Sequence, residues 1–239
     1  MNTDIPPTGT DPGRWVANLL QISDAFYPTG AYAHSFGLEG LVQEGVVTDR
    51  AKLRTFLLEH ALPLLARTDL PIAAGVWTAA GDPVDWARIA EGCVLGSAVR
   101  GAREPREASE AIGRQRIELA SMLRGGLAAE FNRRATEACW PRPACVAAAI
   151  EGRQLGAPRD AVLASLVYSA AAGLIAAAMK LLRLGQNSAQ SLLAEGLALT
   201  PLLIDQALAL APGEIGGFHP WWDIAAARHE SADGRMFIS

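Results

Sequence analysis

Apolar residues recur along this chain at intervals of three and four, the spacing that places them on one face of a helix. One such face, in residues 49–66, consists of Leu53, Phe56, Leu57, Ala61, Leu64 and Leu65. A second consists of Ala108, Ala111, Ile112, Leu119, Met122 and Leu123. No run of β-branched residues alternates with polar ones, so the pattern predicts helices and gives no indication of a sheet.

Capping residues and prolines mark the expected ends of several helices. Asp82, which precedes a proline, predicts a capped start for a helix that continues to about residue 100. Asn187 is the expected cap of a later helix, residues 200–211 form the next, and Pro220 opens a last short one.

The most apolar segment lies between Pro158, which can open a helix, and Gly185, which can close one. At about 1.5 Å per residue, this helix is roughly 40 Å long. Residues 161–179 carry no charge, which is long enough to cross a membrane. They are rich in alanine, however, and Ser169, Gly173 and Ala177 form a small-residue stripe against which another helix can pack closely. We therefore predict a buried central helix and no membrane span.

The fold class that follows is all-α, a single-domain helical bundle around the long apolar central helix. Residues 1–13 contain three prolines and two glycines and are expected to form a flexible leader, followed by one domain over residues 14–239. The three cysteines have no CxxC spacing, and the chain starts without a signal-peptide pattern. Both features favour a cytoplasmic protein with reduced thiols.

Composition and charge narrow the classes of function. Half of the residues are apolar and 19% are charged, which is typical of a globular protein. The net charge is −4, whereas nucleic acids and anionic membranes are bound through basic surfaces, so neither is expected as a partner. No glycine-rich phosphate-binding loop occurs, and the chain is not expected to bind a nucleotide itself.

The residues give weak support for catalysis or metal binding. Ser35 lies in a loosened GxSxG pattern, but turn-forming residues precede it where a hydrolase requires a strand. The four histidines, His34, His60, His219 and His229, have no metal-binding spacing, although subunits of an oligomer could share ligands. We predict no catalytic residue and no metal site; a hydrolase, a membrane protein and a free-standing metallochaperone are the alternatives.

Lys180 and the C-terminal tail are the features that composition does not explain. Lys180 follows the uncharged run, where it either complements the helix dipole at the surface or meets a carboxylate of a partner. In the tail, Phe218, Trp221 and Trp222 fall within five residues, and the last five residues include arginine, methionine and phenylalanine. Such residues are enriched at interfaces, so the tail is expected to bind another protein, unless it covers the domain's own core.

Four blocks of sequence carry a resemblance to a known family. They are LLQISDAFYPTGAYAHSFGLE (19–39), REASEAIGRQ (106–115), MKLLRLGQNSAQ (179–190) and DIAAARHESADGRMFIS (223–239). Together, and in this order, they resemble the urease accessory protein UreF family over nearly the full length of the chain.

The resemblance implies an all-helical homodimer without enzymatic activity. Members of the family join a urease accessory protein of the D (or H) type to a nickel-carrying GTPase of the G type, and the assembly delivers nickel to apo-urease. The F-type protein recruits the GTPase, has been proposed to regulate GTP hydrolysis, and is implicated in lining a passage for nickel between subunits. Nickel would thus be handled by the complex, with no cofactor bound directly by this chain.

The tail contains five positions that match the family. His229 and Glu230 match an RHE segment, and Arg235, Phe237 and Ser239 match the RLFxS ending, which packs and helps to bind the D-type partner. The resemblance therefore implies that these residues bind a partner.

Three further matches lie in and after the central helix. Lys180 matches a lysine at the GTPase-facing surface, and Tyr168 and Gln186 match positions in the same region. The sequence departs from the family at Ala31, where a glycine is usual, and at residues 233–234, where the family commonly has a tyrosine before the final arginine. The second departure concerns how the tail docks.

Overall fold

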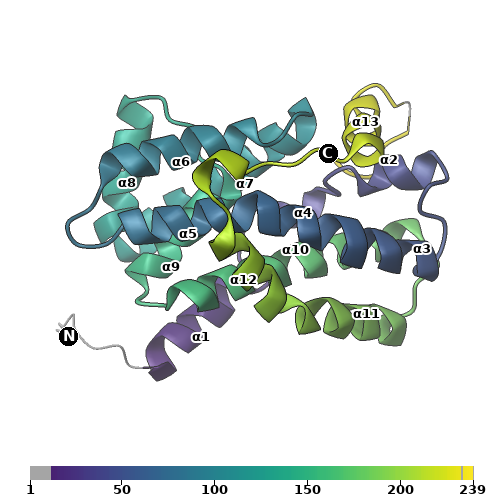
Figure 1. Ribbon diagram of the computed structural model, residues 1–239, viewed down its shortest axis with the longest axis horizontal. Coiled ribbons are helices and arrows are strands. Elements are labelled where there is room, and N and C mark those ends of the chain that lie inside the picture. Colours follow the sequence, from purple (N-terminus) through teal and green to yellow (C-terminus); the bar gives the residue numbers. More distant parts are fainter. Residues whose placement is uncertain (1–11, 233, 239) are drawn as a thin grey trace.

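A computed structural model describes residues 12–232 and 234–238 of the chain. These residues form helices joined by short loops and contain no strand, so the all-α prediction is confirmed (Figure 1). Most of the predicted leader, residues 1–13, lies outside the described residues, and the first helix begins at Pro12.

The N-terminal half of the chain supplies seven of the α-helices. They are α1 (Pro12–Ser23), α2 (Leu38–Gln43), α3 (Arg50–Thr55), α4 (Leu62–Arg67), α5 (Asp69–Ala79), α6 (Trp86–Ala98) and α7 (Arg103–Arg124). A short 3-10 turn, η1 (Ala31–Ala33), precedes α2. A π-helical segment, η2 (Phe56–Ala61), joins α3 to α4, so the predicted amphipathic helix over 49–66 is present as one continuous helical run.

The C-terminal half supplies the remaining helices. They are α8 (Gly126–Glu137), α9 (Ala144–Gln154), α10 (Arg159–Leu181), α11 (Gln186–Ala198), α12 (Thr200–Ala209), the short η3 (Pro212–Glu214) and α13 (Pro220–His229). The predicted helices at 200–211 and after Pro220 are therefore confirmed, the first ending two residues early.

Two predicted caps are wrong. The α6 helix begins at Trp86, and the carboxylate of Asp85, not that of Asp82, accepts a hydrogen bond of 3.1 Å from the backbone N–H of Arg88. Asp82 instead lies in the turn before the helix. Similarly, Asn187 lies in the first turn of α11, whose N-cap position is occupied by Gly185.

The predicted central helix exists as α10, which packs against α2, α5, α9, α11 and α12. It ends at Leu181 because Leu182 adopts an extended conformation, and its 23 residues make it about 34 Å long. Gly185 does not close it, since this glycine lies beyond the helix in an extended conformation. By length and apolar composition, α10 and the run 186–209 could each cross a membrane, a property they share with core helices of soluble proteins.

Burial on α10 is one-sided. Val167, Ala171 and Ala178 are buried, whereas Ser169 and Gly173 are exposed. The predicted small-residue stripe therefore faces outward at these two positions, although its third member, Ala177, is buried.

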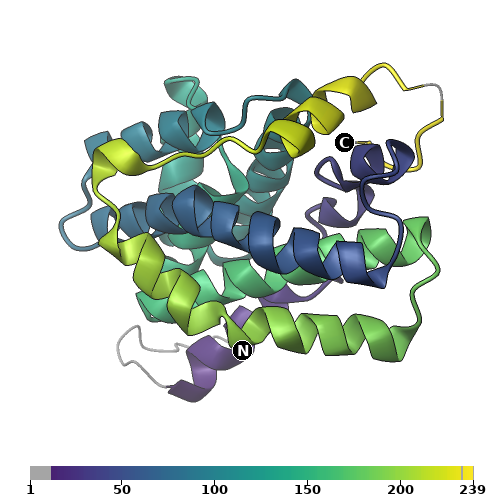
Figure 2. The same cartoon turned by 45° about the vertical axis from the view of Figure 1, so that its right-hand side comes forward.

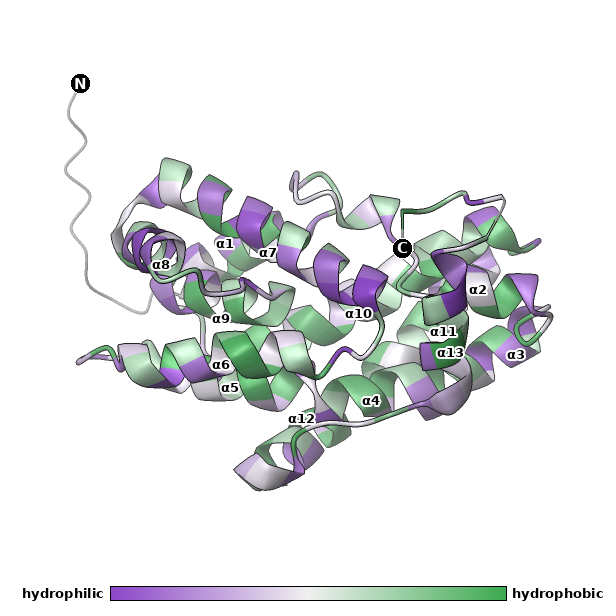
Figure 3. Cartoon of the chain, turned by 90° about the horizontal axis from the view of Figure 1, so that it is seen from above, coloured by the Kyte–Doolittle hydropathy of each residue, from purple (hydrophilic) through white to green (hydrophobic). Residues whose placement is uncertain are grey.

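Apolar residues collect on the helices at the centre of the bundle. The α5 helix is largely hydrophobic and mostly buried, whereas the outer turns of α7 are hydrophilic (Figure 3). The α9 helix is buried along most of its length and carries the charged Glu151, which is only 1% exposed.

The Glu151 carboxylate is paired on three sides. It accepts from Arg116 Nε at 2.8 Å, from Arg124 Nη1 at 3.2 Å and from the Tyr27 hydroxyl at 2.7 Å. Burial, followed by the hydrogen bond to this carboxylate, raises the pKa of Tyr27 to about 12. Since Tyr27 precedes η1, these bonds fix the loop between α1 and η1 to α7 and α9.

The α7 and α9 helices approach closely because Gly113 has no side chain. A methyl group at this position would overlap the carbonyl oxygen of Arg142, just before α9. We therefore expect Gly113→Ala to lower the free energy of unfolding by about 1–3 kcal/mol, since backbone has to move. Urea titration followed by far-UV circular dichroism measures this.

Gly75→Ala is the matched control. Gly75 lies on the exposed side of α5 with open space around it. Because alanine favours the helix, this change should be neutral or stabilise by about 0.5–1 kcal/mol. Equal effects of the two substitutions would contradict the close approach.

Candidate functional site

The residues described after α13, 230–232 and 234–238, are termed here the C-terminal tail; they turn back over α2 toward η1 (Figures 1 and 2). The amide side chain of Gln43 donates to the carbonyl oxygen of Gly234 at 2.8 Å. Near the end of the chain, the backbone N–H of Ile238 donates to the carbonyl oxygen of Ala33 at 2.9 Å. The tail therefore lies against residues about 200 positions earlier in the sequence.

The connection that precedes α13 carries the chain across the molecule to this place. After α12 it runs back beside α4 (Figure 2), where the backbone N–H of Gly216 donates to the carbonyl oxygen of Arg67 at 2.9 Å. The Nη2 atom of Arg67 in turn donates to the carbonyl oxygen of Glu214 at 3.3 Å. At the start of α13, the ring of His219 and the carboxylate of Asp223 satisfy the first backbone N–H groups.

Two glycines allow α13 to lie directly on α2. A Cβ atom on Gly40 would stand 2.6 Å from the carbonyl oxygen of Ala225, and one on Gly37 would stand 2.8 Å from the Cβ of Ala226. The indole of Trp222 adds a hydrogen bond of 2.6 Å to the carbonyl oxygen of Phe36. These contacts set the position of the last turn of α13, which carries His229.

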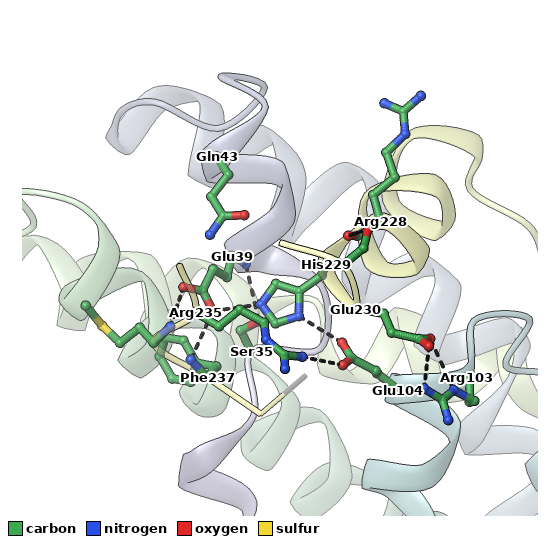
Figure 4. Close-up of polar contacts among 12 residues, drawn as sticks. Ser35, Glu39, Gln43, Arg103, Glu104, Arg228, His229, Glu230, Arg235 and Phe237 are labelled. Carbon is green, nitrogen blue, oxygen red and sulfur yellow. Dashed lines mark hydrogen bonds and ion pairs between the residues drawn. The ribbon is translucent and has the colours of Figure 1, made fainter. Parts of the chain in front are cut away.

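His229 is the centre of the site. Its side chain is buried between two carboxylates: Nε2 lies 2.9 Å from Glu39 on α2, and Nδ1 lies 2.8 Å from Glu104 on α7 (Figure 4). The same Glu104 carboxylate also accepts from Arg235 Nη1 at 2.7 Å. The site therefore joins α2, α7, α13 and the tail.

Glu39 binds the backbone of the tail. Its two carboxylate oxygens accept the N–H groups of Met236 at 2.7 Å and Phe237 at 3.0 Å (Figure 4). Burial on its own would raise the pKa of Glu39, but these two donors and the side chain of His229 outweigh it and hold the pKa below its usual value. The ionised form is thus the one that the folded site favours.

The tail brings Phe237 and Lys180 together. The ring of Phe237 is buried, and Lys180 Nζ lies 4.9 Å from its centroid, a cation–π contact. Lys180 is exposed at the end of α10, so its ammonium reaches the surface and the ring packs beneath it.

Other parts of the tail face outward. The side chains of Met236 and Ile238 are more than 60% exposed, and that of Arg235 is 40% exposed. Glu230 forms a bidentate ion pair with Arg103 of α7 at the surface. Phe237 thus covers the domain's own core, as one of the two expectations for the tail requires, while its neighbours remain accessible.

The other predicted site residues lie elsewhere. Tyr168 is 38% exposed on α10, and Gln186 is exposed as the first residue of α11. In the described part of the chain, neither forms a hydrogen bond or ion pair with the tail, whereas Lys180 lies over the ring of Phe237. Ser239 lies outside the described residues, as does Asp233 of the sequence departure.

Of the two tryptophans at the start of α13, only Trp222 serves the core. Trp222 packs edge-on against Phe56 with ring centroids 4.9 Å apart, whereas Trp221 is 66% exposed. Sequence reasoning did not select Glu39 or Glu104 as site residues. A signal for Glu39 was available, because it is a charged residue inside the apolar run 38–42.

Ser35 lacks the setting of a nucleophile. It is 1% exposed, and its hydroxyl accepts a hydrogen bond of 3.2 Å from the backbone N–H of Glu39. No strand precedes it in the described residues, so the strand–turn–helix that a nucleophile elbow requires is missing there. Within the same residues, no cluster of three or more histidine, cysteine or acidic side chains could hold a metal ion.

Comparison with known proteins identifies the family. The family model described as UreF matches residues 47–196. The chain belongs to the UreF family. A urease accessory protein UreF of Granulibacter bethesdensis is 31% identical over the full length of both chains, and one of Arthrobacter sp. (strain FB24) is 30% identical over 95% of this chain and 98% of its own.

As a UreF protein, the chain is a urease accessory protein involved in urease maturation and is not itself an enzyme. A further relative, the bifunctional urease accessory protein UreEF of Bordetella bronchiseptica, is 30% identical over 94% of this chain and 52% of its own length. The matched residues 47–196 include Lys180 and Gln186, but neither Glu39 nor the tail.

The lowered pKa of Glu39 predicts a loss of stability in acid. The pKa of Glu39 in the folded chain lies below that of an exposed glutamate, so its contribution to stability is present above the pKa of the unfolded chain and is lost as the pH falls through the folded pKa. We expect Glu39→Gln to flatten the acid limb of the stability profile, measured by urea titration at a series of pH values. Glu59→Gln, at an exposed position on η2, is the control and should keep the wild-type slope. An unchanged acid limb in Glu39→Gln would refute this role.

Proposed function

We propose that this UreF protein is a non-enzymatic scaffold for nickel insertion into apo-urease. It joins an accessory protein of the D (or H) type to a nickel-carrying GTPase of the G type, and it does so as a homodimer in the cytoplasm. Nickel is handled by the complex, with no cofactor bound directly by this chain, and the scaffold regulates GTP hydrolysis by the way it holds the GTPase. The observation that carries the proposal is the two-faced tail, which is anchored inside the domain and presents apolar side chains outside.

The tail is assigned to the D-type partner. Exposed methionine and isoleucine side chains beside an arginine are typical of a protein interface, and here Met236, Ile238 and Arg235 have this arrangement. Because Glu39 holds the tail backbone in place, less conformational entropy is lost when a partner binds these side chains. Asp233, which departs from the family pattern, precedes this held stretch.

The end of α10 and the start of α11 are assigned to the GTPase. Lys180 offers an exposed ammonium at the C-terminal end of α10, and the side chain of Gln186 is exposed a few residues later. A cation at this position is suited to a carboxylate or phosphate on the partner.

The outward face of α10 is assigned to a second copy of the chain. Ser169, Gly173 and Ala176 are small and exposed, and Tyr168 and Met179 flank them with 38% and 37% exposure. Small residues allow two helices to approach closely, and a two-fold axis would bring the same face of two copies together. Other subunits of the urease accessory complex complete the assembly, and the fused UreEF relative supports UreE as one that works beside UreF.

The GTPase assignment predicts that Lys180→Ala weakens capture of the G-type protein without loss of the fold. The ammonium is exposed, so its removal should leave far-UV circular dichroism unchanged. Retention of the GTPase on immobilised chain, in the presence of the D-type partner, should fall several-fold, as expected for loss of about 1–2 kcal/mol from a charged contact. Lys52→Ala removes the other lysine of the chain and is the control. Equal retention by both variants would rule out this role.

The tail assignment predicts that D-type binding depends on the outward side chains. Deletion of residues 235–239 should reduce complex formation on size-exclusion chromatography, but it also leaves Glu39 without its two backbone donors. Met236→Ser together with Ile238→Ser keeps those backbone donors and should weaken binding about tenfold or more, since each apolar side chain contributes about 1 kcal/mol or more when buried. Leu202→Ser, at a similarly exposed residue of α12, is the control. Wild-type affinity of the double variant would exclude the assignment.

A further inference from the structure

The contacts of His229 determine which protonation state of its ring fits the site. A neutral imidazole has one N–H donor and one bare nitrogen that accepts, whereas an ionised carboxylate only accepts. Both ring nitrogens of His229 face carboxylate oxygens, at 2.9 Å from Glu39 and 2.8 Å from Glu104. The two contacts are both hydrogen bonds when each ring nitrogen carries a proton, that is, when the ring is an imidazolium.

The charges around the ring agree with this state. Glu104 is shared with Arg235 of the tail, whereas Glu39 forms no ion pair with a lysine or arginine in the described residues. The compensation for the buried Glu39 charge therefore comes from His229 and from two backbone N–H groups. Without a positive ring, a buried carboxylate would face the lone pair of a nitrogen, which is repulsive and costly in a site closed to water.

Further charged groups lie around this centre. His34, the C-cap residue of η1, lies near the charge of Glu104. Burial lowers the pKa of His34 and outweighs the opposing effect of that charge. Glu230, next to His229 in the chain, is held by Arg103 of α7, and on α10 Lys180 lies over Phe237. Arg228 of α13 is paired with Glu44. Glu230, Lys180 and Arg228 thus have partners other than Glu39 and Glu104, whereas Arg235 is paired with Glu104.

We propose that His229 is a protonation-dependent latch for the C-terminal tail. The doubly protonated ring fixes Glu39 in the position from which it binds the N–H groups of Met236 and Phe237. Loss of one ring proton breaks a contact to one carboxylate and releases residues 235–238 from α2, η1 and Lys180. Only the consequence of the latch, which is control of partner binding, rests on the proposed function. Docking of the tail can itself be measured in the isolated chain.

The direction of the pH dependence follows from proton linkage. The docked tail needs both ring protons of His229, because each proton makes one of the two carboxylate contacts. Docking therefore weakens as the pH rises, by up to about tenfold per pH unit for one proton. On the acid side, docking weakens when Glu39 itself becomes protonated. Tail docking is thus strongest where Glu39 is ionised and His229 carries both ring protons.

Two measurements on the full chain test the latch. Nitrogen chemical shifts of ¹⁵N-histidine report the protonation of each ring nitrogen of His229, and hydrogen exchange reports protection of the amides of Met236, Phe237 and Ile238. We expect both ring nitrogens to be protonated while the three amides are protected, and protection, corrected for intrinsic exchange, to fall together with the second ring proton as the pH rises. A singly protonated ring beneath a protected tail, or protection that persists after the proton is lost, would overturn the proposal.

A conservative variant separates the latch from simple structural support. In Glu104→Gln, the side-chain amide can donate to a bare Nδ1 and its oxygen can still accept from Arg235, so a singly protonated ring fits the site. We expect this variant to keep its tail protected at alkaline pH values that release the wild-type tail. Glu118→Gln, exposed on the same helix, should retain the wild-type pH profile. The same alkaline midpoint in Glu104→Gln and the wild type would refute the latch.

A second variant covers the case in which Glu104→Gln does not fold. His229→Gln cannot carry a positive charge, so its tail amides should lose protection at every pH while far-UV circular dichroism shows the bundle intact. Wild-type protection in this variant would equally refute the latch. Since these readouts involve no partner, they can fail while partner capture succeeds, or succeed while the scaffold assignment fails.

Discussion

A carboxylate enclosed in a protein interior is tolerated only where donors surround it. Glu39 is such a group, and its donors come from parts of the chain that are remote from it in sequence: the ring of His229 and the backbone of residues 236–237. This requirement explains the course of the C-terminal region. The connection beside α4, the close contact of α13 with α2, and the reversal of the tail all serve to bring those donors to one carboxylate.

The α7 helix links this site to the rest of the bundle. Its first turn carries Glu104, which receives His229 and Arg235, and its later turns carry Arg116 and Arg124, which hold Glu151 of α9. Through Tyr27, the second cluster also fixes the loop that leads to η1, and η1 receives the end of the tail. The α7 helix therefore contributes to two clusters around buried acidic side chains, one beneath the tail and one that holds the loop leading to η1. Partner binding at the tail, as proposed, would act on a rigidly supported segment.

Much of the fold could be predicted from the spacing of apolar residues, because burial of one helix face leaves a periodic trace. The helical run over 49–66 and the central helix are examples, and Pro220 marked α13 because proline fits the first turn of a helix. Caps were less predictable, since Asp82 and Asp85 are both suitable by residue type and only the local backbone path selects Asp85. The site could be predicted from the sequence only in part. His229 and Phe237 were selected by resemblance to the family, whereas Glu39 and Glu104 become partners of His229 only when α2, α7 and α13 converge in the fold.

The separation in sequence between Glu39 and its backbone donors gives the tail contact an additional meaning. Glu39 accepts from the N–H groups of Met236 and Phe237, which lie almost 200 positions further along the chain. Bringing such distant segments together costs loop-closure entropy, which the contacts between them have to offset. If the helices pack without this contact, the Glu39 carboxylate lacks both backbone donors and has to keep its hydration. The surface that the tail presents therefore depends on a pairing of remote segments and not on either segment alone.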